Sequence, residues 1–226
     1  MKWLIWKEYR LNRLILIVGA VLLIAPHAIA LYFAWRGIGP PANGVASPLA
    51  ANLLISGGYS LVISQLMLAF LGGHAIACER ADRSAEFLAY LPVSRARILA
   101  AKLTLPLFWA ALIWTANLLI LRLVIAELPL PGKRVEEQVW LMLSLTALTG
   151  LVFFSVGWLL SSMLESPTFS ICGALIAPLL IVMAGIPLDW MNILHRAELW
   201  YLFTCLALAP ACFIAGTWYY LRRVEP

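Results

Sequence analysis

Residues 53–77 read Leu-Leu-Ile-Ser-Gly-Gly-Tyr-Ser-Leu-Val-Ile-Ser-Gln-Leu-Met-Leu-Ala-Phe-Leu-Gly-Gly-His-Ala-Ile-Ala, a run without Asp, Glu, Lys or Arg. About 20 consecutive apolar residues in a helix cross the ~30 Å hydrocarbon core of a bilayer. This run is longer than a buried strand or a soluble core helix needs. It therefore predicts a membrane-spanning helix.

Similar apolar runs lie on both sides of this one. The predicted spans are 14–35, 53–77, 98–121, 139–163, 168–188 and 199–221. The composition agrees with that reading, because 63% of the 226 residues are hydrophobic and only 12% are charged, against about 25% charged in an ordinary soluble domain. We predict an all-α membrane protein whose residues 1–226 form a single transmembrane domain of six helices.

Basic residues are distributed unevenly between the two sides of these spans. One side carries Lys2, Lys7, Arg10, Arg13, Arg80, Arg83, Arg95, Arg97, Lys102, Arg222 and Arg223, and the other carries Arg36, Arg122, Lys133, Arg134 and Arg196. The positive-inside rule makes the richer side cytoplasmic, and with it both termini. The net charge of +5 is then explained by topology and anionic lipid, so we expect no nucleic-acid partner.

The chain lacks the features of a self-sufficient pump or enzyme. No Gly-x-x-x-x-Gly-Lys-Ser/Thr pattern is present, so no P-loop can hold ATP phosphates. No polar stretch approaches the roughly 100 residues of a soluble catalytic domain. The four cysteines, Cys78, Cys172, Cys205 and Cys212, have no metal-ligand spacing and read as buried free thiols. We therefore expect no catalytic, cofactor or metal site here, and an energy source on another chain.

Residues 1–13 combine aromatic and charged side chains directly before the first span. The relevant residues are Trp3, Trp6, Lys7, Glu8, Tyr9 and Arg10. Aromatic rings prefer the headgroup level, and basic groups pair with lipid phosphates. We predict an interfacial elbow helix over 1–13 that leads into the first span. The alternative is a plain positive-inside flank with interfacial anchors.

The cytoplasmic segment 78–97 is more hydrophobic than a simple connection, which would be short and polar. It predicts a short helix that Asp82 or Ser84 caps and Pro92 ends, while Ser94 caps the helix of the third span. One face of this short helix would carry Glu86, Phe87, Tyr90 and Leu91. Such a mixed face favours a partner surface, and the alternative is packing on the protein's own bundle or on the bilayer.

These residues resemble a known family. Glu79-Arg80, Glu86-Phe87-Leu88, Leu91-Pro92-Val93-Ser94-Arg95 and Lys102 look like the loop between the second and third spans of type 2 ABC transporter permeases. The run Trp6-Lys7-Glu8-Tyr9-Arg10 is similar to the entry into their elbow helix. The resemblance covers the layout of the whole chain, although only these segments carry it at the level of motifs. The exterior segment near 186–198 is more compact than an elaborate extracellular gate would need.

The resemblance implies a function and a set of partners. Segment 78–97 would hold the coupling helix that docks on a separate dimeric ABC ATPase, which binds the ATP and Mg. The implied ATPase-coupling residues are Glu79, Arg80, Glu86, Phe87, Leu88, Tyr90, Leu91, Pro92 and Arg95. A second permease chain, identical or related, would complete an exporter in the cell membrane, a prokaryotic inner membrane.

Small and polar residues inside the spans form a further candidate surface. Ser56, Ser60 and Ser64 recur every fourth residue, with Gln65 beside them. Such stripes let helices approach closely, so this one forms a pathway or dimer surface, or else packs within one chain.

Two other classes of function compete with the permease. An ATP-independent transporter or scaffold fits the composition. An intramembrane enzyme fits it less well, because no Asp or Glu lies deep in a span and no two His are helix neighbours.

Overall fold

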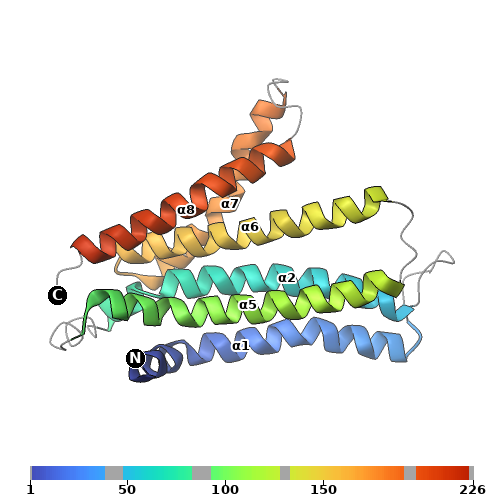
Figure 1. The fold of residues 1–226 in the computed structure, drawn as a ribbon, viewed down its shortest axis with the longest axis horizontal. Helices are drawn as coiled ribbons and strands as arrows, with labels where there is room; N and C mark the ends of the chain where they lie inside the picture. Colours follow the sequence, from blue (N-terminus) through green and yellow to red (C-terminus); the bar gives the residue numbers. More distant parts are fainter. Residues whose placement is uncertain (1, 39–47, 83–92, 128–132, 191–196, 224–226) are drawn as a thin grey trace. The chain divides into compact units, whose positions relative to one another are not determined.

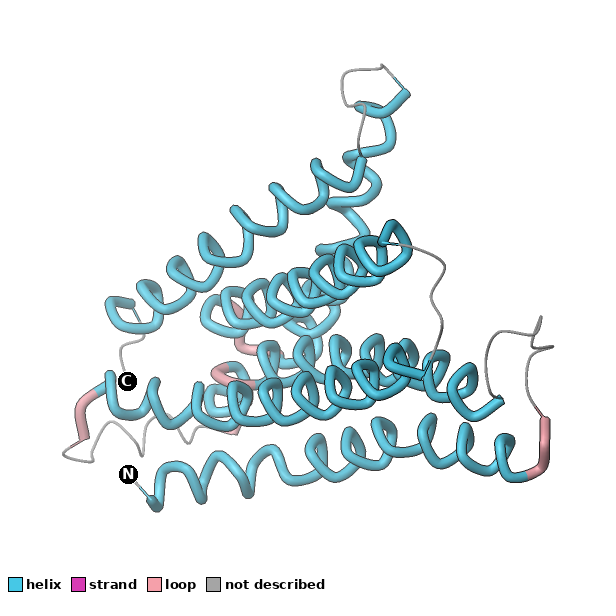
Figure 2. The backbone as a smooth tube through the Cα atoms, turned by 45° about the vertical axis from the view of Figure 1, so that its right-hand side comes forward, coloured by secondary structure: helices cyan, strands magenta, loops and turns pink. Residues whose placement is uncertain are grey.

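The computed structural model describes residues 2–38, 48–82, 93–127, 133–190 and 197–223, and within these ranges it contains helices and no strand (Figure 2). The helices are α1 (Lys2–Trp35), α2 (Pro48–His74), α3 (Ala77–Ala81), α5 (Arg95–Glu127), α6 (Lys133–Met163), α7 (Pro167–Trp190) and α8 (Ala197–Arg223), and Figure 1 labels all of them except α3. The all-α prediction is thereby confirmed.

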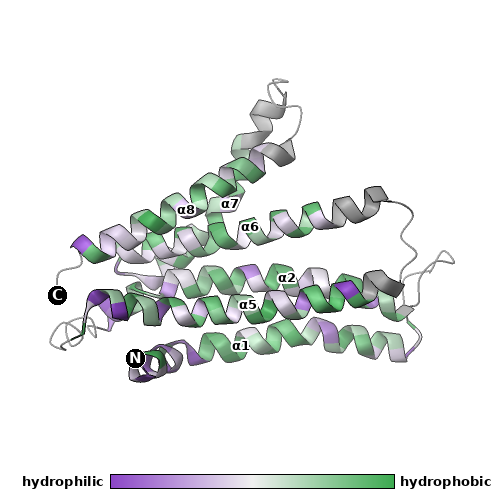
Figure 3. Ribbon diagram, in the orientation of Figure 1, coloured by the Kyte–Doolittle hydropathy of each residue, from purple (hydrophilic) through white to green (hydrophobic). Residues whose placement is uncertain are grey.

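Six of these helices are long and apolar enough to cross a membrane. The candidate spans are Lys2–Trp35, Leu49–His74, Arg95–Leu123, Trp140–Met163, Pro167–Ala184 and Trp200–Arg222. Helices suit this task because every backbone N–H and C=O within a bilayer needs a partner inside the protein. Figure 3 shows hydrophobic residues along these helices and hydrophilic residues in the first turns of α1 and α5. The prediction of six spans is confirmed.

Several helix boundaries differ from the predicted spans, and two of these differences concern the residues discussed below. α1 runs without interruption from Lys2 to Trp35, so the predicted elbow residues and the first span belong to one helix. The interfacial position of that elbow stays a prediction. α2 ends at His74, three residues before the predicted end at 77, and a turn at 75–76 leads into α3. This turn is where the backbone begins to bond to another helix, as described below.

The helices contribute to two compact units. The first unit contains Met1–Asn12, Gln65–Pro106 and Ala147–Pro226, and the second contains Arg13–Ser64 and Leu107–Thr146. The helices α3, α7 and α8 lie in the first unit, whereas α1, α2, α5 and α6 each contribute to both. The single transmembrane domain over 1–226 stays a prediction.

Packing in the first unit depends on small residues and on two apolar clusters. One cluster joins α6, α7 and α8 through Val152, Ile181, Cys205 and Ala209, and the other joins α1 and α5 through Leu4, Ile98 and Ala101. Glycines also let α2 and α6 approach each other closely. A Cβ atom added at Gly157 would lie 2.8 Å from the backbone nitrogen of Gly73. Only glycine lets two helices come this near.

Candidate functional site

The start of the predicted coupling segment lies in α3, which a side chain of another helix holds in place. The backbone N–H groups of Ile76 and Ala77 both donate to Oγ of Ser161 on α6, each at 2.8 Å. Ile76 stands at the N-cap position and makes no side-chain capping bond of its own. The first amides of a helix lack intrahelical partners, so Ser161 supplies this cap.

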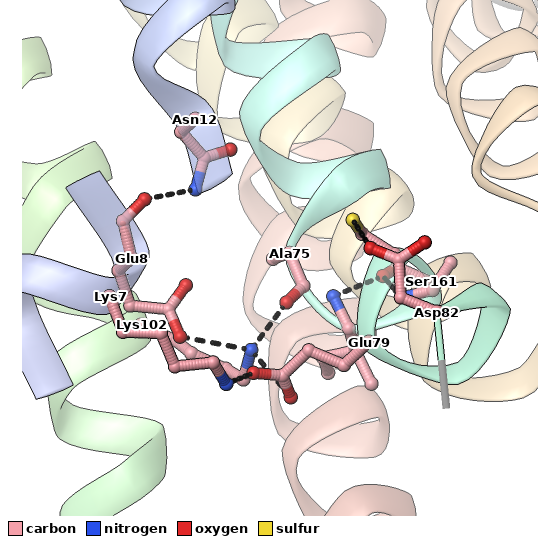
Figure 4. A network of polar contacts seen from close by, with 11 residues as sticks. Lys7, Glu8, Asn12, Ala75, Glu79, Asp82, Lys102 and Ser161 are labelled. Atoms are coloured by element: carbon pink, nitrogen blue, oxygen red, sulfur yellow. Dashed lines mark hydrogen bonds and ion pairs between the residues drawn. The ribbon is translucent and has the colours of Figure 1, made fainter. Parts of the chain in front are cut away.

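Glu79 points from α3 into the protein rather than toward solvent. Its side chain is 3% exposed, and Oε2 lies 2.9 Å from Nζ of Lys102 on α5. The ammonium group of Lys7 on α1 pairs with the other carboxylate oxygen, Oε1. One carboxylate of α3 therefore joins two other helices (Figure 4).

Lys102 is the centre of this ion cluster, which we define as Lys7, Glu8, Glu79 and Lys102. Its side chain is fully buried, and Nζ lies 3.3 Å from Oε1 of Glu8. The same nitrogen donates to the backbone oxygen of Ala75 at 2.7 Å. With Glu79, these contacts match the three donors of a lysine ammonium group. When all four groups are ionised, the two cations balance the two carboxylates, which is the arrangement that makes buried ions tolerable.

The electrostatics of Glu79 follow from these neighbours. Burial acts to raise the pKa of the Glu79 carboxyl, because an ionised group loses hydration. The ammonium groups of Lys102 and Lys7, and the hydrogen bonds that they donate, outweigh that effect and hold the pKa below its ordinary value of 4.5. Glu79 is consequently ionised at neutral pH, and the ion pairs persist there.

Two arginines near the ends of the predicted coupling segment donate hydrogen bonds to backbone carbonyls of other helices. Arg80 is half-buried, and its guanidinium donates to the carbonyl oxygen of Ser162 on α6. Arg95, in the first turn of α5, donates from Nη1 to the carbonyl oxygen of Leu221 on α8 at 3.2 Å. Both residues therefore contact other helices of this chain, although neither was predicted to do so.

The predicted elbow residues divide between two faces of α1. Trp3, Trp6 and Tyr9 are 45%, 60% and 38% exposed, and the rings of Trp6 and Tyr9 stack with their centroids 5.5 Å apart. Arg10 is exposed as well. Lys7 and Glu8 instead reach the ion cluster, and Glu8 is only 4% exposed. The outer face thus has the aromatic and basic character that suits a headgroup layer.

Most of the predicted coupling helix falls outside the described residues. These are Glu86, Phe87, Leu88, Tyr90, Leu91 and Pro92. Asp82, one of two predicted caps for that helix, stands at the C-terminal end of α3, where its carboxylate accepts a hydrogen bond from the Cys78 thiol. Ser94 was predicted to cap the helix of the third span. Its carbonyl accepts hydrogen bonds from the N–H groups of Arg97 and Ile98, and α5 begins at the next residue.

The serine stripe of α2 lies inside the chain. Ser56, Ser60 and Ser64 are 2%, 1% and 1% exposed, and Gln65 is 6% exposed. Ser56 also lies 3.0 Å from Nδ1 of His27 on α1. This burial is what packing within one chain requires. A role of the stripe as a pathway or dimer surface stays a prediction.

Sequence reasoning missed the ion cluster, although one signal was present. Lys102 lies inside the predicted span 98–121, and an ionisable residue within a span is rare unless it is paired. The position of Lys102 therefore indicates that a carboxylate pairs with it, but the sequence does not identify that carboxylate. Among the described residues, no group of three His, Cys, Asp or Glu side chains is arranged to hold a metal ion. The four cysteines are free, and Cys172 is exposed rather than buried.

A known protein family matches most of the chain. A family model described as "ABC-2 family transporter protein" matches residues 5–185. This match includes most of the predicted elbow, all of segment 78–97 and five of the six spanning helices at least in part. No curated protein and no solved structure matches the chain.

Proposed function

This chain belongs to the ABC-2 family of transporter permeases, and we propose that it is the membrane-spanning subunit of an ATP-driven exporter. Members of this family are membrane subunits of transporters and are not themselves catalytic. ATP and Mg would be bound by a separate ABC ATPase dimer, since the chain has no P-loop. A second permease chain, identical or related, would complete the assembly.

The observation that carries this proposal is the anchoring of α3 at the start of the cytoplasmic segment. Glu79 and Arg80 turn toward other helices of this chain, so they would brace the segment rather than touch the ATPase. Contact with the ATPase would then come from Glu86, Phe87, Leu88, Tyr90 and Leu91, with Pro92 ending the helix. A docked helix can transmit force only if the residues at its start, here called its base, are held in place. The ion cluster holds α3 in this way.

The proposed cycle follows from this arrangement. ATP binding closes the two ATPase subunits and displaces the coupling helix. Because the base of that helix is bonded to α1, α5 and α6, the displacement shifts these helices as well. The spans then change between an inward-facing and an outward-facing arrangement, and hydrolysis resets them.

The orientation in the membrane is part of the same proposal. Both termini and segment 78–97 would face the cytoplasm of a prokaryotic cell, in agreement with the excess of basic residues on that side. The exposed rings of Trp3, Trp6 and Tyr9, with Arg10 beside them, would contact lipid headgroups. Anionic lipid is the natural partner for this basic, aromatic face.

Purification of the tagged chain from its native membranes tests the proposal. The wild-type protein should bring with it a P-loop ATPase in fixed stoichiometry, identified by mass spectrometry and by ATP hydrolysis. E86K and L91D should reach the membrane in normal amounts and lose the ATPase. E165K, an exposed charge reversal in the turn between α6 and α7, is the matched control and should keep it. A wild-type preparation without any ATPase would refute the proposed function.

A further inference from the structure

The start of α3 depends on one hydroxyl group for its hydrogen bonds. α3 has only five residues, from Ala77 to Ala81, and a helix this short cannot sustain itself through its own ladder. The N–H groups of Glu79 and Arg80 donate to the carbonyl of Ile76 at 3.1 and 3.4 Å. The N–H groups of Ile76 and Ala77 use Ser161 instead.

Water has little access to this capping bond. Ile76, Ala77 and Ser161 are 1%, 0% and 0% exposed. A buried amide that loses its partner costs the full desolvation of that group, because nothing replaces the lost hydrogen bond. Removal of the Ser161 hydroxyl would therefore leave two buried amides unpaired and loosen α3 locally.

Close packing one turn earlier brings Ser161 to this position. Gly157 precedes Ser161 by four residues in α6, so the two lie on one face of that helix. Gly73 lies in the last turn of α2, four residues before Ala77. A Cβ at Gly157 would lie 2.8 Å from the nitrogen of Gly73 and 3.2 Å from the carbonyl oxygen of Ala69. The backbones of α2 and α6 consequently meet where α2 ends and the chain turns into α3.

We propose that Ser161 is a positioning residue that makes the base of the coupling segment move together with the end of α6 and the start of α7. This inference rests on the proposed function. Ser161 and Ser162 occupy the last turn of α6, and both accept hydrogen bonds from the region of α3, the second from Arg80. Only residues 164–166 separate α6 from α7. Displacement of α3 therefore reaches the hairpin of α6 and α7 directly.

Ser162 provides a matched control on the same turn. It is 0% exposed, like Ser161, but its hydroxyl donates only to the carbonyl of Leu159 in its own helix, at 2.7 Å. S162A thus removes a buried hydroxyl of the same size without touching the cap of α3. It also keeps the backbone carbonyl that accepts from Arg80. S161T keeps a hydroxyl at position 161 and serves as the conservative variant.

Hydrogen exchange of the purified permease–ATPase complex tests the inference, with and without ATP and vanadate. In the wild type, nucleotide should change amide exchange in peptides that cover 76–82 and 159–170. S161A should retain the ATPase and exchange about tenfold faster at 76–82, as expected for lost buried hydrogen bonds. In S161A, the response of amide exchange to nucleotide should persist at 76–82 and become smaller at 159–170. In the double variant S161A/R80Q, the response at 159–170 should be absent. S161T should restore the response, and S162A should leave it unchanged.

Several results would overturn the inference. A full nucleotide response at 159–170 in S161A/R80Q means that α3 does not drive this hairpin. Unchanged exchange at 76–82 in S161A means that the hydroxyl does not hold α3, and loss of the ATPase from S161A assigns Ser161 to docking instead. A wild-type complex without a nucleotide response at 159–170 also refutes it. These results are distinct from failure of the proposed function, in which the wild-type chain carries no ATPase at all.

Discussion

Nζ of Lys102 lies 2.9 Å from Oε2 of Glu79, and the lysine side chain has no exposed surface. The two residues belong to α5 and α3, on either side of the predicted coupling helix. This buried pair links α3, where the segment 78–97 begins, to the first turns of α5, where it ends. The stability of the protein should therefore depend on Lys102 far more than on an ordinary surface lysine.

K102M should destabilise the protein strongly. Removal of one partner from a buried ion pair costs about 3–5 kcal/mol, because the remaining carboxylate is left without compensation. K7M is the control, since the Lys7 side chain is 21% exposed and water can replace part of its contact with Glu79. It should cost about 1 kcal/mol or less. Thermal unfolding of the detergent-purified variants compares them, and equal midpoints would contradict a central role for Lys102.

The contribution of Glu79 to stability should decrease at acidic pH. Its pKa in the folded protein lies below the ordinary value of 4.5, mainly because Lys102 and Lys7 outweigh the effect of burial. The unfolded chain therefore binds a proton first as pH falls, and the stabilisation, complete above pH 4.5, is lost as pH falls through the folded pKa.

A comparison of wild type with E79Q isolates this effect from other titrating groups. The difference between their unfolding midpoints should be largest near about pH 6 and should shrink toward about pH 3. A difference that stays constant over this range, or grows as the pH falls, would show that the ion pairs do not hold the Glu79 carboxyl in its charged form.

Cys78 should react slowly with thiol reagents at neutral pH. Burial raises the pKa of its thiol, the Asp82 carboxylate adds to this effect, and the result is a pKa of about 11. The Cys78 thiol also donates to Oδ2 of Asp82, at 3.5 Å. Because the thiolate is the reactive form, maleimide labelling should rise about tenfold per pH unit from roughly pH 7 to 9.

D82N should accelerate this labelling at a fixed pH, because it removes the negative charge that opposes ionisation of the thiol. E165Q removes a carboxylate from the exposed turn after α6 and should leave the rate unchanged. Mass spectrometry of the peptide that contains Cys78 separates it from the other cysteines. A D82N rate no higher than that of the wild type would refute the influence of Asp82.

Hydropathy predicted the six spanning helices because a bilayer permits few alternatives. A long apolar run must satisfy its own backbone hydrogen bonds, so length and composition suffice to place α1, α2 and α5 to α8. The boundaries are harder, since the turn after His74 depends on a serine of α6 that lies 84 and 85 residues away in the sequence.

The ion cluster could be predicted only in part. Lys102 within a span indicated that a partner exists. The identity of its partners is a tertiary matter, because Glu8 lies 94 residues from Lys102. The charge pattern of residues 1–13 predicted a surface helix with Lys7 and Glu8 on it, and no local rule distinguishes these two inward residues from Arg10. The serine spacing of α2 likewise predicted one common face, but not the His27 side chain that meets Ser56.

G157A should destabilise the contact between α2 and α6. Its Cβ would lie 2.8 Å from the nitrogen of Gly73 and 3.1 Å from the carbonyl carbon of Gly72, and backbone atoms cannot rotate away as a side chain could. Overpacking of this kind costs about 1–3 kcal/mol, which exceeds the gain of up to about 1 kcal/mol from replacing glycine in a helix. G58A is the control, because a Cβ there would meet no atom within 4 Å. It should be neutral or slightly stabilising, and a G157A midpoint equal to that of G58A would show that the two backbones are not in contact.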